Sequence, residues 1–258
     1  MTTSNVHALR RTLRAELVAG RRRVGTFIKL ATPDVIELAV AAGFDFVVVD
    51  LEHSTLSESD AIALVRHADA VNLAALVRVP SVDAPLIARL LENGAVGIQL
   101  SMLRTATQSR ALLAAACFAP EGQRSVSLAN RVAGFGALPL GGFLQAEADA
   151  PPILVGQIET AVSEPWGAVL DGLDVSFVGS TDLAVSLGYP AGDERISVAV
   201  QTVHDAADRA CVTFGGWAST AGAAIGLGLG EAAYLIVGSD LQILASGLRA
   251  AREQESTV

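Results

Sequence analysis

The stretch "FDFVVVDLEHST", residues 44–55, joins an apparent buried strand to a group of charged side chains. Its apolar centre is rich in β-branched residues and is typical of a strand that is covered on both faces. Asp50, Glu52 and His53 follow directly. Because a buried charge costs several kcal/mol unless it is paired, hydrogen-bonded or bound to a metal, the end of this strand is a candidate functional site.

Similar apolar runs lie along the whole chain, and segments with helical periodicity separate nearly all of them. The eight expected strands are residues 24–29, 46–51, 74–79, 97–102, 152–159, 175–180, 212–217 and 234–239. Eight alternating β and α units predict an α/β fold, a single (β/α)8 TIM barrel domain over residues 1–258. The alternative is a doubly wound open sheet with "GLGLG", residues 226–230, as a dinucleotide loop. That segment closes a helix and precedes a strand, the reverse of the required order.

The N-terminal segment, residues 1–23, is rich in arginine and has helical periodicity. Leu9, Leu13 and Leu17 are spaced four apart and form one stripe of a helix. A transit peptide is the alternative interpretation, but Glu16 and the direct passage into a strand favour a first helix of the domain.

Composition limits the function classes. Apolar residues make up 51% of the chain and charged residues 17%, and no apolar run reaches the ~18 residues of a membrane span. A net charge of −9 argues against a nucleic-acid partner. Cys117 and Cys211 lie in apolar segments without metal-ligand spacing, which is typical of core thiols. We therefore expect a cytoplasmic protein that binds neither membranes nor nucleic acid.

In a TIM barrel the catalytic residues gather at the carboxyl ends of the strands. The polar residues at these ends are Lys29, Asp50, Glu52, His53, Arg78, Gln157, Glu159, Ser180, Thr181, Asp182 and Trp217. Glu159 and Asp182 come from adjacent strands and would suit an octahedral Mg²⁺ or Mn²⁺ that also takes water and substrate oxygens. Alternatively, each carboxylate pairs with an arginine, or Asp182 caps the following helix.

His53 and Arg78 are candidates for the chemistry itself. Neighbouring carboxylates can fix the tautomer of His53 for general acid–base work, although a structural histidine is the alternative. Arg78 ends an apolar strand, where its guanidinium is placed to bind a carboxylate or a developing enolate.

Six segments, in this order, carry a resemblance to a known family: "GFDFVVVDLEH", "VRVP", "LLENGAVGI", "GQIET", "GSTDLAVSLG" and "AAYLIVGSD". The chain resembles the HpcH/HpaI aldolases, metal-dependent pyruvate aldolases of the 2-dehydro-3-deoxyglucarate and 4-hydroxy-2-oxoheptanedioate type. The resemblance implies a (β/α)8 barrel that assembles as a homo-oligomer, a hexamer or trimer. It also implies a carbon–carbon lyase that converts a 4-hydroxy-2-oxo acid into pyruvate and an aldehyde.

The resemblance also implies roles for individual residues. Glu159 and Asp182 would hold a divalent metal, Mg²⁺, Mn²⁺ or Co²⁺, and the reaction would pass through a metal-bound pyruvate enolate. Arg78 would contact the keto or enolate oxygen. The remaining roles are aldehyde-side acid–base chemistry for His53, orientation of water and ligands for Asp50 and Glu52, and substrate binding for Gln157, Ser180, Thr181 and Trp217.

Several positions depart from the family pattern, mostly on the acceptor side. Glu92 stands where an aspartate commonly partners the catalytic histidine. Residues 120–151 form the expected substrate-side loop insertion, which keeps Arg124 as a substrate contact but has Ser125 and Ser127 where glycines are usual. Serines also replace the usual prolines at positions 101 and 180.

Two alternatives to an aldolase stay open, and one residue bears on the mechanism. The same enolate could serve a decarboxylase or a synthetic carbon–carbon bond-forming enzyme, and a non-catalytic metabolite-binding barrel is the other alternative. Lys29 is the only lysine in the chain. It could form a Schiff base, but because both metal ligands are present we expect it to tune the site or to bind a substrate carboxylate.

Overall fold

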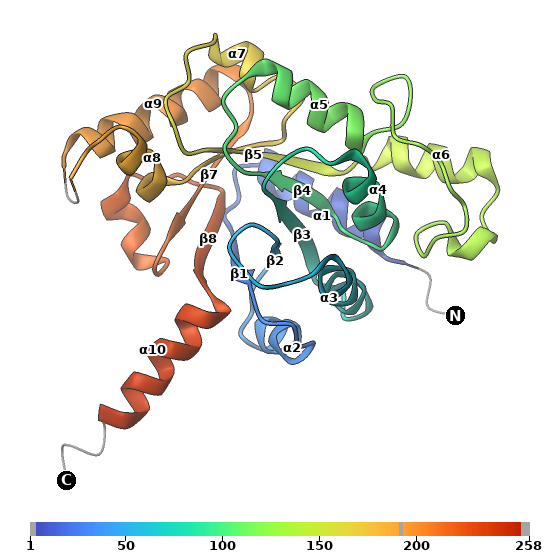
Figure 1. The fold of residues 1–258 in the computed structure, drawn as a ribbon, viewed down its shortest axis with the longest axis horizontal. Helices are drawn as coiled ribbons and strands as arrows, with labels where there is room; N and C mark the ends of the chain where they lie inside the picture. The colour runs from blue at the N-terminus through green and yellow to red at the C-terminus, as the bar shows by residue number, and fades with distance from the viewer. Residues whose placement is uncertain (1–3, 191–192, 254–258) are drawn as a thin grey trace.

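The computed structural model describes residues 4–190 and 193–253, which form a closed barrel of eight parallel strands (Figure 1). The strands are β1 Arg23–Ile28, β2 Phe46–Asp50, β3 Ala74–Val79, β4 Gly97–Leu100, β5 Ile153–Ile158, β6 Val175–Val178, β7 Thr213–Ala218 and β8 Tyr234–Ser239. They follow one another in chain order around the barrel, and β8 pairs with β1 to close it. The predicted TIM barrel is confirmed, and the open-sheet alternative is excluded by this closure.

Helices surround the barrel and connect its strands. They are α1 Val6–Val18, α2 Asp34–Ala41, α3 Glu58–Ala70, α4 Ala84–Glu92, α5 Ala106–Ala116, α6 Leu140–Asp149, α7 Trp166–Val169, α8 Ser180–Ser186, α9 Arg195–Ala210 and α10 Asp240–Glu253, with short 3-10 helices η1 Gly134–Gly136 and η2 Gly222–Leu227. The sequence sets some starts locally: Ser57 and Thr105 each form a capping box with the residue three positions later. No helix in the described ranges is long and apolar enough to cross a membrane.

The barrel interior is filled by aromatic side chains. Phe46 and Tyr234 stack with ring centroids 4.5 Å apart, and Phe177 meets Tyr234 edge-on at 6.0 Å. A Cβ at Gly25 would lie 2.3 Å from the Phe46 ring, so only glycine leaves room for this layer. The aromatic layer lies beneath the carboxyl ends of the strands and supports the residues there.

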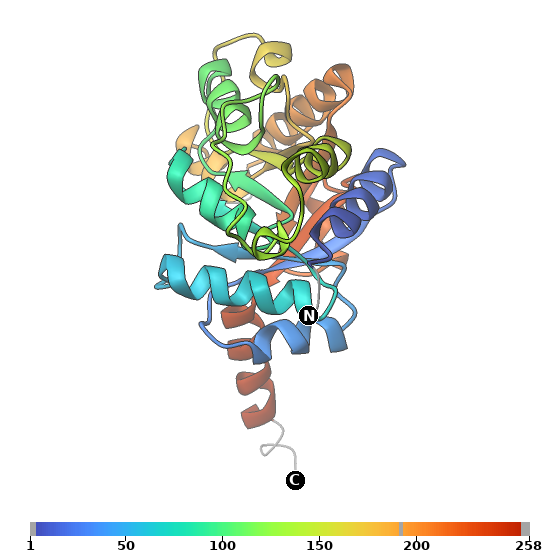
Figure 2. The same cartoon turned by 90° about the vertical axis from the view of Figure 1, so that its right-hand side faces the viewer.

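Helix α1 closes the amino end of the barrel. Its buried residues Val6, Leu13 and Leu17 pack with the inward-facing strand residues. Buried Arg10 on the same face donates to the carbonyl of Ala95, just before β4, at 3.1 Å. Helix α6 and the loop before it lie on the side that faces the viewer in Figure 2.

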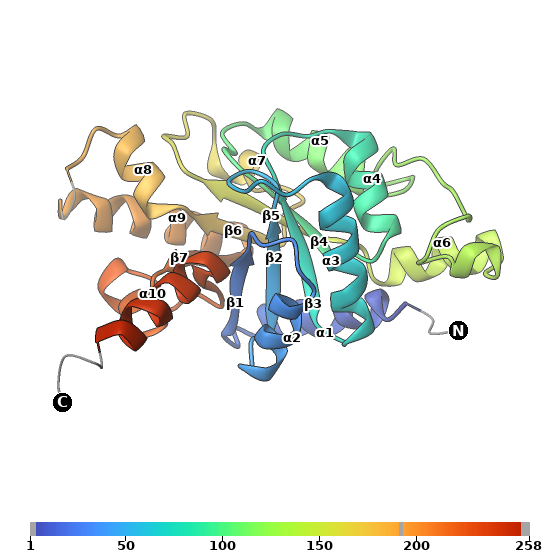
Figure 3. The same cartoon turned by 60° about the horizontal axis from the view of Figure 1, so that its bottom comes forward.

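Helix α10 projects away from the barrel, as Figures 1 and 3 show. None of its residues is buried. The exposed apolar side chains on it are Leu241, Ile243, Leu244 and Leu248. The chain therefore presents an apolar helix surface that its own barrel leaves uncovered.

Candidate active site

Polar side chains from several strands meet in one cavity at the carboxyl end of the barrel. The cavity has a volume of about 260 Å³ and is lined by Phe27, Lys29, Arg78, Gln157, Phe177, Gly179, Ser180, Thr181, Asp182, Trp217, Ser239 and Gln242. Seven of these are among the residues expected from the sequence. Trp217 donates its indole N–H to the carbonyl of Gly238 at 3.2 Å, so it offers the cavity a ring face rather than a donor.

Asp50 and Arg78 form a buried, bidentate ion pair between neighbouring strands. The β2–β3 register sets the two residues side by side. Arg78 Nε and Nη2 donate to the two Asp50 oxygens at 2.8 and 2.6 Å, and Asp50 Oδ1 also accepts the backbone N–H groups of Glu52 and His53. Burial raises the pKa of Asp50, but the hydrogen bonds and charge of Arg78 outweigh it, so the pKa lies below its usual value. Asp50 therefore fixes both the guanidinium and the turn that carries His53.

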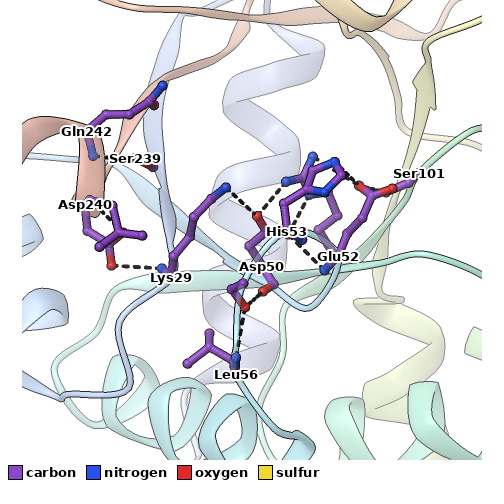
Figure 4. Close-up of polar contacts among 12 residues, drawn as sticks. Lys29, Asp50, Glu52, His53, Leu56, Ser101, Ser239, Asp240 and Gln242 are labelled. Carbon is purple, nitrogen blue, oxygen red and sulfur yellow. Dashed lines mark hydrogen bonds and ion pairs between the residues drawn. The ribbon is translucent and has the colours of Figure 1, made fainter.

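Lys29 approaches Asp50 from the neighbouring strand end, as Figure 4 shows. Lys29 Nζ lies 3.2 Å from Asp50 Oδ2. The backbone N–H groups of Lys29 and Leu30 donate to Asp240 Oδ2 at 2.8 and 2.9 Å. The first residue of α10 thus fastens the end of β1 and fixes where the Lys29 side chain begins.

Glu52 is the carboxylate that lies beside His53. Glu52 Oε2 accepts the hydroxyl of Ser101 at 2.5 Å and lies 3.3 Å from Arg78 Nη1 and 3.6 Å from His53 Nε2 (Figure 4). The His53 side chain is 57% exposed, whereas that of Glu52 is 13% exposed. The imidazole is therefore open to solvent, and His53 is not among the residues that line the cavity, while the carboxylate beside it is held in place.

Glu159 ends a hydrogen-bonded chain that runs through the barrel interior. The Tyr234 hydroxyl donates to Gln99 Oε1 at 3.2 Å, and Gln99 Nε2 donates to Gln157 Oε1 at 2.5 Å. Gln157 Nε2 donates to Glu159 Oε1, and the N–H of Met102 donates to Glu159 Oε2 at 3.0 Å. This chain fixes the orientation of a carboxylate that is only 2% exposed.

The electrostatics around Glu159 and Asp182 fit a divalent cation. Burial raises the pKa of Glu159 to about 7 despite the hydrogen bond from Met102, and the negative charges of Glu52 and Asp182 contribute to the rise. Hard oxygen ligands of this kind suit Mg²⁺ or Mn²⁺. No cluster of three or more His, Cys, Asp or Glu that could hold a metal occurs among the described residues, so these two carboxylates would leave the other positions to water and substrate. The alternative role of Asp182 as a helix cap does not hold, because Gly179 is the N-cap of α8.

Three expected site residues, Glu92, Arg124 and Ser127, lie away from this cavity. Glu92 is the last residue of α4, and its carbonyl accepts the N–H of Val132 from the loop. Arg124 Nη1 donates to Glu147 Oε2 at 3.1 Å. Arg10 donates to the same glutamate and to the carbonyl of Ala95, just before β4, so Arg124 lies near the amino end of the barrel.

The expectations for these residues therefore do not hold within one chain. Glu92 does not orient His53, and Ser127 is exposed on a loop whose neighbours lie at the amino end of the barrel. Residues 120–151 are thus not a substrate-side insertion of their own barrel. The physical reason is that a helix following a barrel strand runs back, so the end of α4 lies at the amino end.

Sequence reasoning missed several residues that the site uses. The Arg78 guanidinium carbon lies 4.2 Å from the centre of the Phe27 ring, so this ring packs against the flat face of the guanidinium. Gln99 is a buried polar residue inside an apolar strand, the same signal that singled out Asp50. Asp240 and the backbone N–H of Met102 gave no local signal, because their roles depend on distant strand ends.

Comparison with known proteins identifies the family. The sequence model of the HpcH/HpaI aldolase/citrate lyase family matches residues 23–244. The chain belongs to this family. The HpcH/HpaI chain is 34% identical to a hydroxypyruvate/pyruvate aldolase of Sagittula stellata over 181 residues, 69% of this chain and 70% of that protein. It is 34% identical to a 4-hydroxy-2-oxovalerate aldolase of Novosphingobium aromaticivorans over 180 residues, 68% of this chain and 67% of that protein.

A solved structure shares the same architecture. The crystal structure of an HpcH/HpaI aldolase from Desulfitobacterium hafniense superposes with a TM-score of 0.87 at 27% identity, covering 95% of this chain and 97% of that one. HpcH/HpaI aldolases are generally divalent-metal-dependent carbon–carbon lyases. The cavity, with Asp182 in its lining, lies at the carboxyl ends of the strands, where TIM-barrel enzymes carry their active sites.

Proposed function

We propose that this HpcH/HpaI protein is a divalent-metal-dependent pyruvate aldolase that cleaves a 4-hydroxy-2-oxo acid into pyruvate and an aldehyde, or joins the two. The observation that carries the proposal is the convergence of Asp182, Gln157 and Arg78 on one cavity, with Glu159 held directly behind it. The aldolase names of the relatives support the reaction class.

Glu159 and Asp182 would hold Mg²⁺, Mn²⁺ or Co²⁺. When bound, such a cation supplies a Lewis acid for the oxygens of a 2-oxo acid. The raised pKa of Glu159 supports this assignment, because a carboxylate that is buried beside other carboxylates is stabilised by a cation.

Arg78 would bind the keto oxygen and stabilise the negative charge that develops on it. Asp50 holds the guanidinium through Nε and Nη2, and the Phe27 ring supports its face. The donor is therefore oriented before the reaction, so little reorganisation is needed as the charge forms.

His53 would accept the proton of the 4-hydroxyl group during cleavage. The bond between C3 and C4 then breaks, the aldehyde forms at C4, and the electron pair passes to the pyruvate enolate, which takes a proton at C3 from water. Glu52, 3.6 Å from His53 Nε2, would stabilise the protonated imidazole. Glu52 thereby takes the orienting role that the sequence suggested for Glu92.

We also propose that the protein assembles as a homo-oligomer, a hexamer or trimer. The exposed apolar side chains of α10, Leu244 and Leu248 among them, would be covered by a second copy. Glu92, Arg124 and Ser127 could act at a catalytic rim only in another copy. Light scattering coupled to size-exclusion chromatography tests this, and a wild-type monomer at micromolar concentration would contradict it.

A cytoplasmic location completes the proposal. Both cysteines of the chain, Cys117 and Cys211, are free thiols, which supports a reducing compartment. Cell fractionation with an antibody to the protein would test it, and recovery outside the cytoplasmic fraction would contradict it.

Proton exchange at the pyruvate methyl group tests the enolate chemistry without knowledge of the aldehyde. Incubation of the protein with Mn²⁺ and pyruvate in D2O should replace the methyl protons by deuterium. Mass spectrometry of the pyruvate measures this exchange. EDTA should stop the exchange, and excess Mn²⁺ should restore it. Absence of exchange with every divalent metal tested, or full exchange in chelator, would contradict the proposed function.

A further inference from the structure

Gln99 and Tyr234 form a buried polar pair across the barrel interior. Gln99 lies on β4, whose other residues are glycine, isoleucine and leucine, and Tyr234 lies on β8, on the opposite side of the closed barrel. Both side chains are fully buried. Because replacing a buried hydrogen-bonded pair by apolar groups of the same shape is nearly neutral for stability, the barrel does not need a polar pair at this place.

The hydrogen bonds between Tyr234 and Glu159 run in one direction when Glu159 is ionised. An ionised carboxylate only accepts hydrogen bonds, so Gln157 must present Nε2 to Glu159 Oε1. The Gln157 carbonyl then points inward and needs a donor, which is Gln99 Nε2 at 2.5 Å. Gln99 Oε1 in turn needs a donor, and the Tyr234 hydroxyl supplies it at 3.2 Å. Each amide is therefore fixed by a neighbour at both of its ends.

Tyr234 is suited to be the terminal donor of this chain. Burial raises the pKa of Tyr234 well above its usual value, so the hydroxyl keeps its proton. The ring stacks on Phe46 and meets the edge of Phe177, which fixes where the hydroxyl lies. The donor is thus held in place by packing alone.

The direction of the chain decides what Gln157 presents at the active site. Gln157 lines the cavity, and among the described residues its Nε2 donates only to Glu159. Since an amide has two N–H groups, the second can serve a bound molecule. A reversed amide would instead turn its carbonyl oxygen toward the carboxylate and the cavity, where it would repel Glu159.

The same direction leaves Glu159 ready for a cation. Glu159 Oε1 accepts from Gln157 and Oε2 accepts from the N–H of Met102. A carboxylate offers about four acceptor positions, so two remain for a cation. A reversed Gln157 amide would break one of the two bonds that orient these positions.

We propose that Gln99 and Tyr234 are positioning residues of the active site, which set the Gln157 amide with its carbonyl inward and its N–H groups toward Glu159 and the cavity. Neither residue lines the cavity, so both act through Gln157. This inference rests on the proposed aldolase function and extends its machinery into the barrel interior. It predicts that cation affinity depends on a hydroxyl group from the far side of the barrel.

The test measures Mn²⁺ affinity by calorimetric titration in Gln99→Met and Tyr234→Phe. Gln99→Met keeps a side chain of similar length without the amide, and Tyr234→Phe keeps the ring without the donor. Groups that orient a metal ligand contribute about 10- to 100-fold to metal affinity. Because Gln99 acts one residue further away, we expect Gln99→Met to lower the affinity about 10-fold. Tyr234→Phe should lower it about 2- to 5-fold, as loss of one neutral hydrogen bond predicts.

The double variant separates a shared chain from two unrelated core changes. Because both residues act through one chain, Tyr234→Phe should have no further effect on Mn²⁺ affinity in the Gln99→Met background. Residues that only stabilise the fold would lower the melting temperature and leave the affinity unchanged. At saturating Mn²⁺, Gln99→Met should also raise the KM for pyruvate in proton exchange more than it lowers kcat, because the second N–H of Gln157 is no longer directed at the cavity.

Ser176 on β6 provides the matched control. It is fully buried, and its hydroxyl has no hydrogen-bond partner among the described residues. Ser176→Ala therefore deletes a barrel hydroxyl as Tyr234→Phe does, but it breaks no chain, and it should bind Mn²⁺ as the wild type does. Thermal unfolding checks that each variant folds, and Tyr234→Phe remains the test if Gln99→Met does not.

Three results would overturn the inference. The first is wild-type Mn²⁺ affinity in both single variants, and the second is a double variant in which the two losses add. The third is a wild-type KM for pyruvate in Gln99→Met together with a lower kcat. If the wild type itself binds no Mn²⁺, the proposed cation site fails and the inference fails with it, whereas Mn²⁺ binding and proton exchange that are equal in all variants would overturn the inference alone.

Discussion

Replacement of Gly179 by alanine should disable the cation site while leaving the barrel folded. A Cβ at this position would lie 2.8 Å from Glu159 Cγ and 3.1 Å from Glu159 Oε1. Contacts this short force Glu159 to move, and this movement would disturb the hydrogen bonds from Met102 and Gln157 that hold its carboxylate. The backbone itself accepts alanine, since Gly179 has a φ of −89°.

The size of the effect follows from the displaced ligand. Loss of groups that orient a metal ligand typically lowers metal affinity about 10- to 100-fold, and we expect Gly179→Ala to fall in that range. Calorimetric titration with Mn²⁺ measures the affinity directly, and pyruvate proton exchange at limiting Mn²⁺ should fall in parallel. Excess Mn²⁺ should recover part of the exchange.

A matched glycine provides the control. Gly167 lies in α7, and a Cβ added there would point into open space, with no neighbouring atom within 4 Å. Gly167→Ala should bind Mn²⁺ as the wild type does. If Gly179→Ala binds Mn²⁺ with wild-type affinity and exchanges pyruvate protons at the wild-type rate, the argument that Glu159 is a positioned metal ligand is wrong.

Three further predictions address the ligands, the acid–base group and the buried ion cluster. Glu159→Gln and Asp182→Asn should each lower Mn²⁺-dependent exchange at least about 100-fold, since each removes one of two protein ligands; normal exchange in either variant would exclude that residue. His53→Ala should lower the rate of aldol cleavage about 100-fold or more but lower the rate of pyruvate proton exchange less. Glu52→Gln should show the same pattern with smaller losses. Equal losses of His53→Ala in both assays would place His53 in the enolisation step. Burial raises the pKa of Glu147, but Arg10, His7 and Arg124 lower it to about 2. Because this folded-state pKa lies below the usual 4.5, Glu147 contributes about 3 kcal/mol above pH 4.5, and this contribution is lost as the pH falls toward 2. Urea unfolding of wild type and Glu147→Gln should therefore differ strongly at pH 7 and much less at pH 3; an equal difference at both would refute the assignment.

The strands and the rim of the barrel were predictable because both depend on local pattern. Apolar β-rich runs located all eight strands, with ends that differ from the structure by at most two residues. Charged residues at or near the carboxyl ends of such runs located Lys29, Arg78 and Asp182 at the cavity. A parallel barrel brings the carboxyl ends of its strands together, so position in the strand was sufficient.

The remaining parts of the site depend on contacts that a linear pattern does not encode. Glu92 occupies the position where the family commonly has an aspartate, but it lies at the end of α4, away from the carboxyl end of its own barrel. Gln99 and Phe27 act only through the side chains that they meet across the barrel. Within one chain the carboxylate beside His53 is that of its sequence neighbour Glu52, 3.6 Å from Nε2.

The most direct test of the account is a crystal structure of the protein with Mn²⁺ and pyruvate, with the metal located by its anomalous scattering. The account predicts one strong anomalous peak coordinated by the carboxylates of Glu159 and Asp182, with a pyruvate oxygen within hydrogen-bond distance of Arg78. A metal bound elsewhere, or pyruvate bound without contact to Arg78, would contradict it.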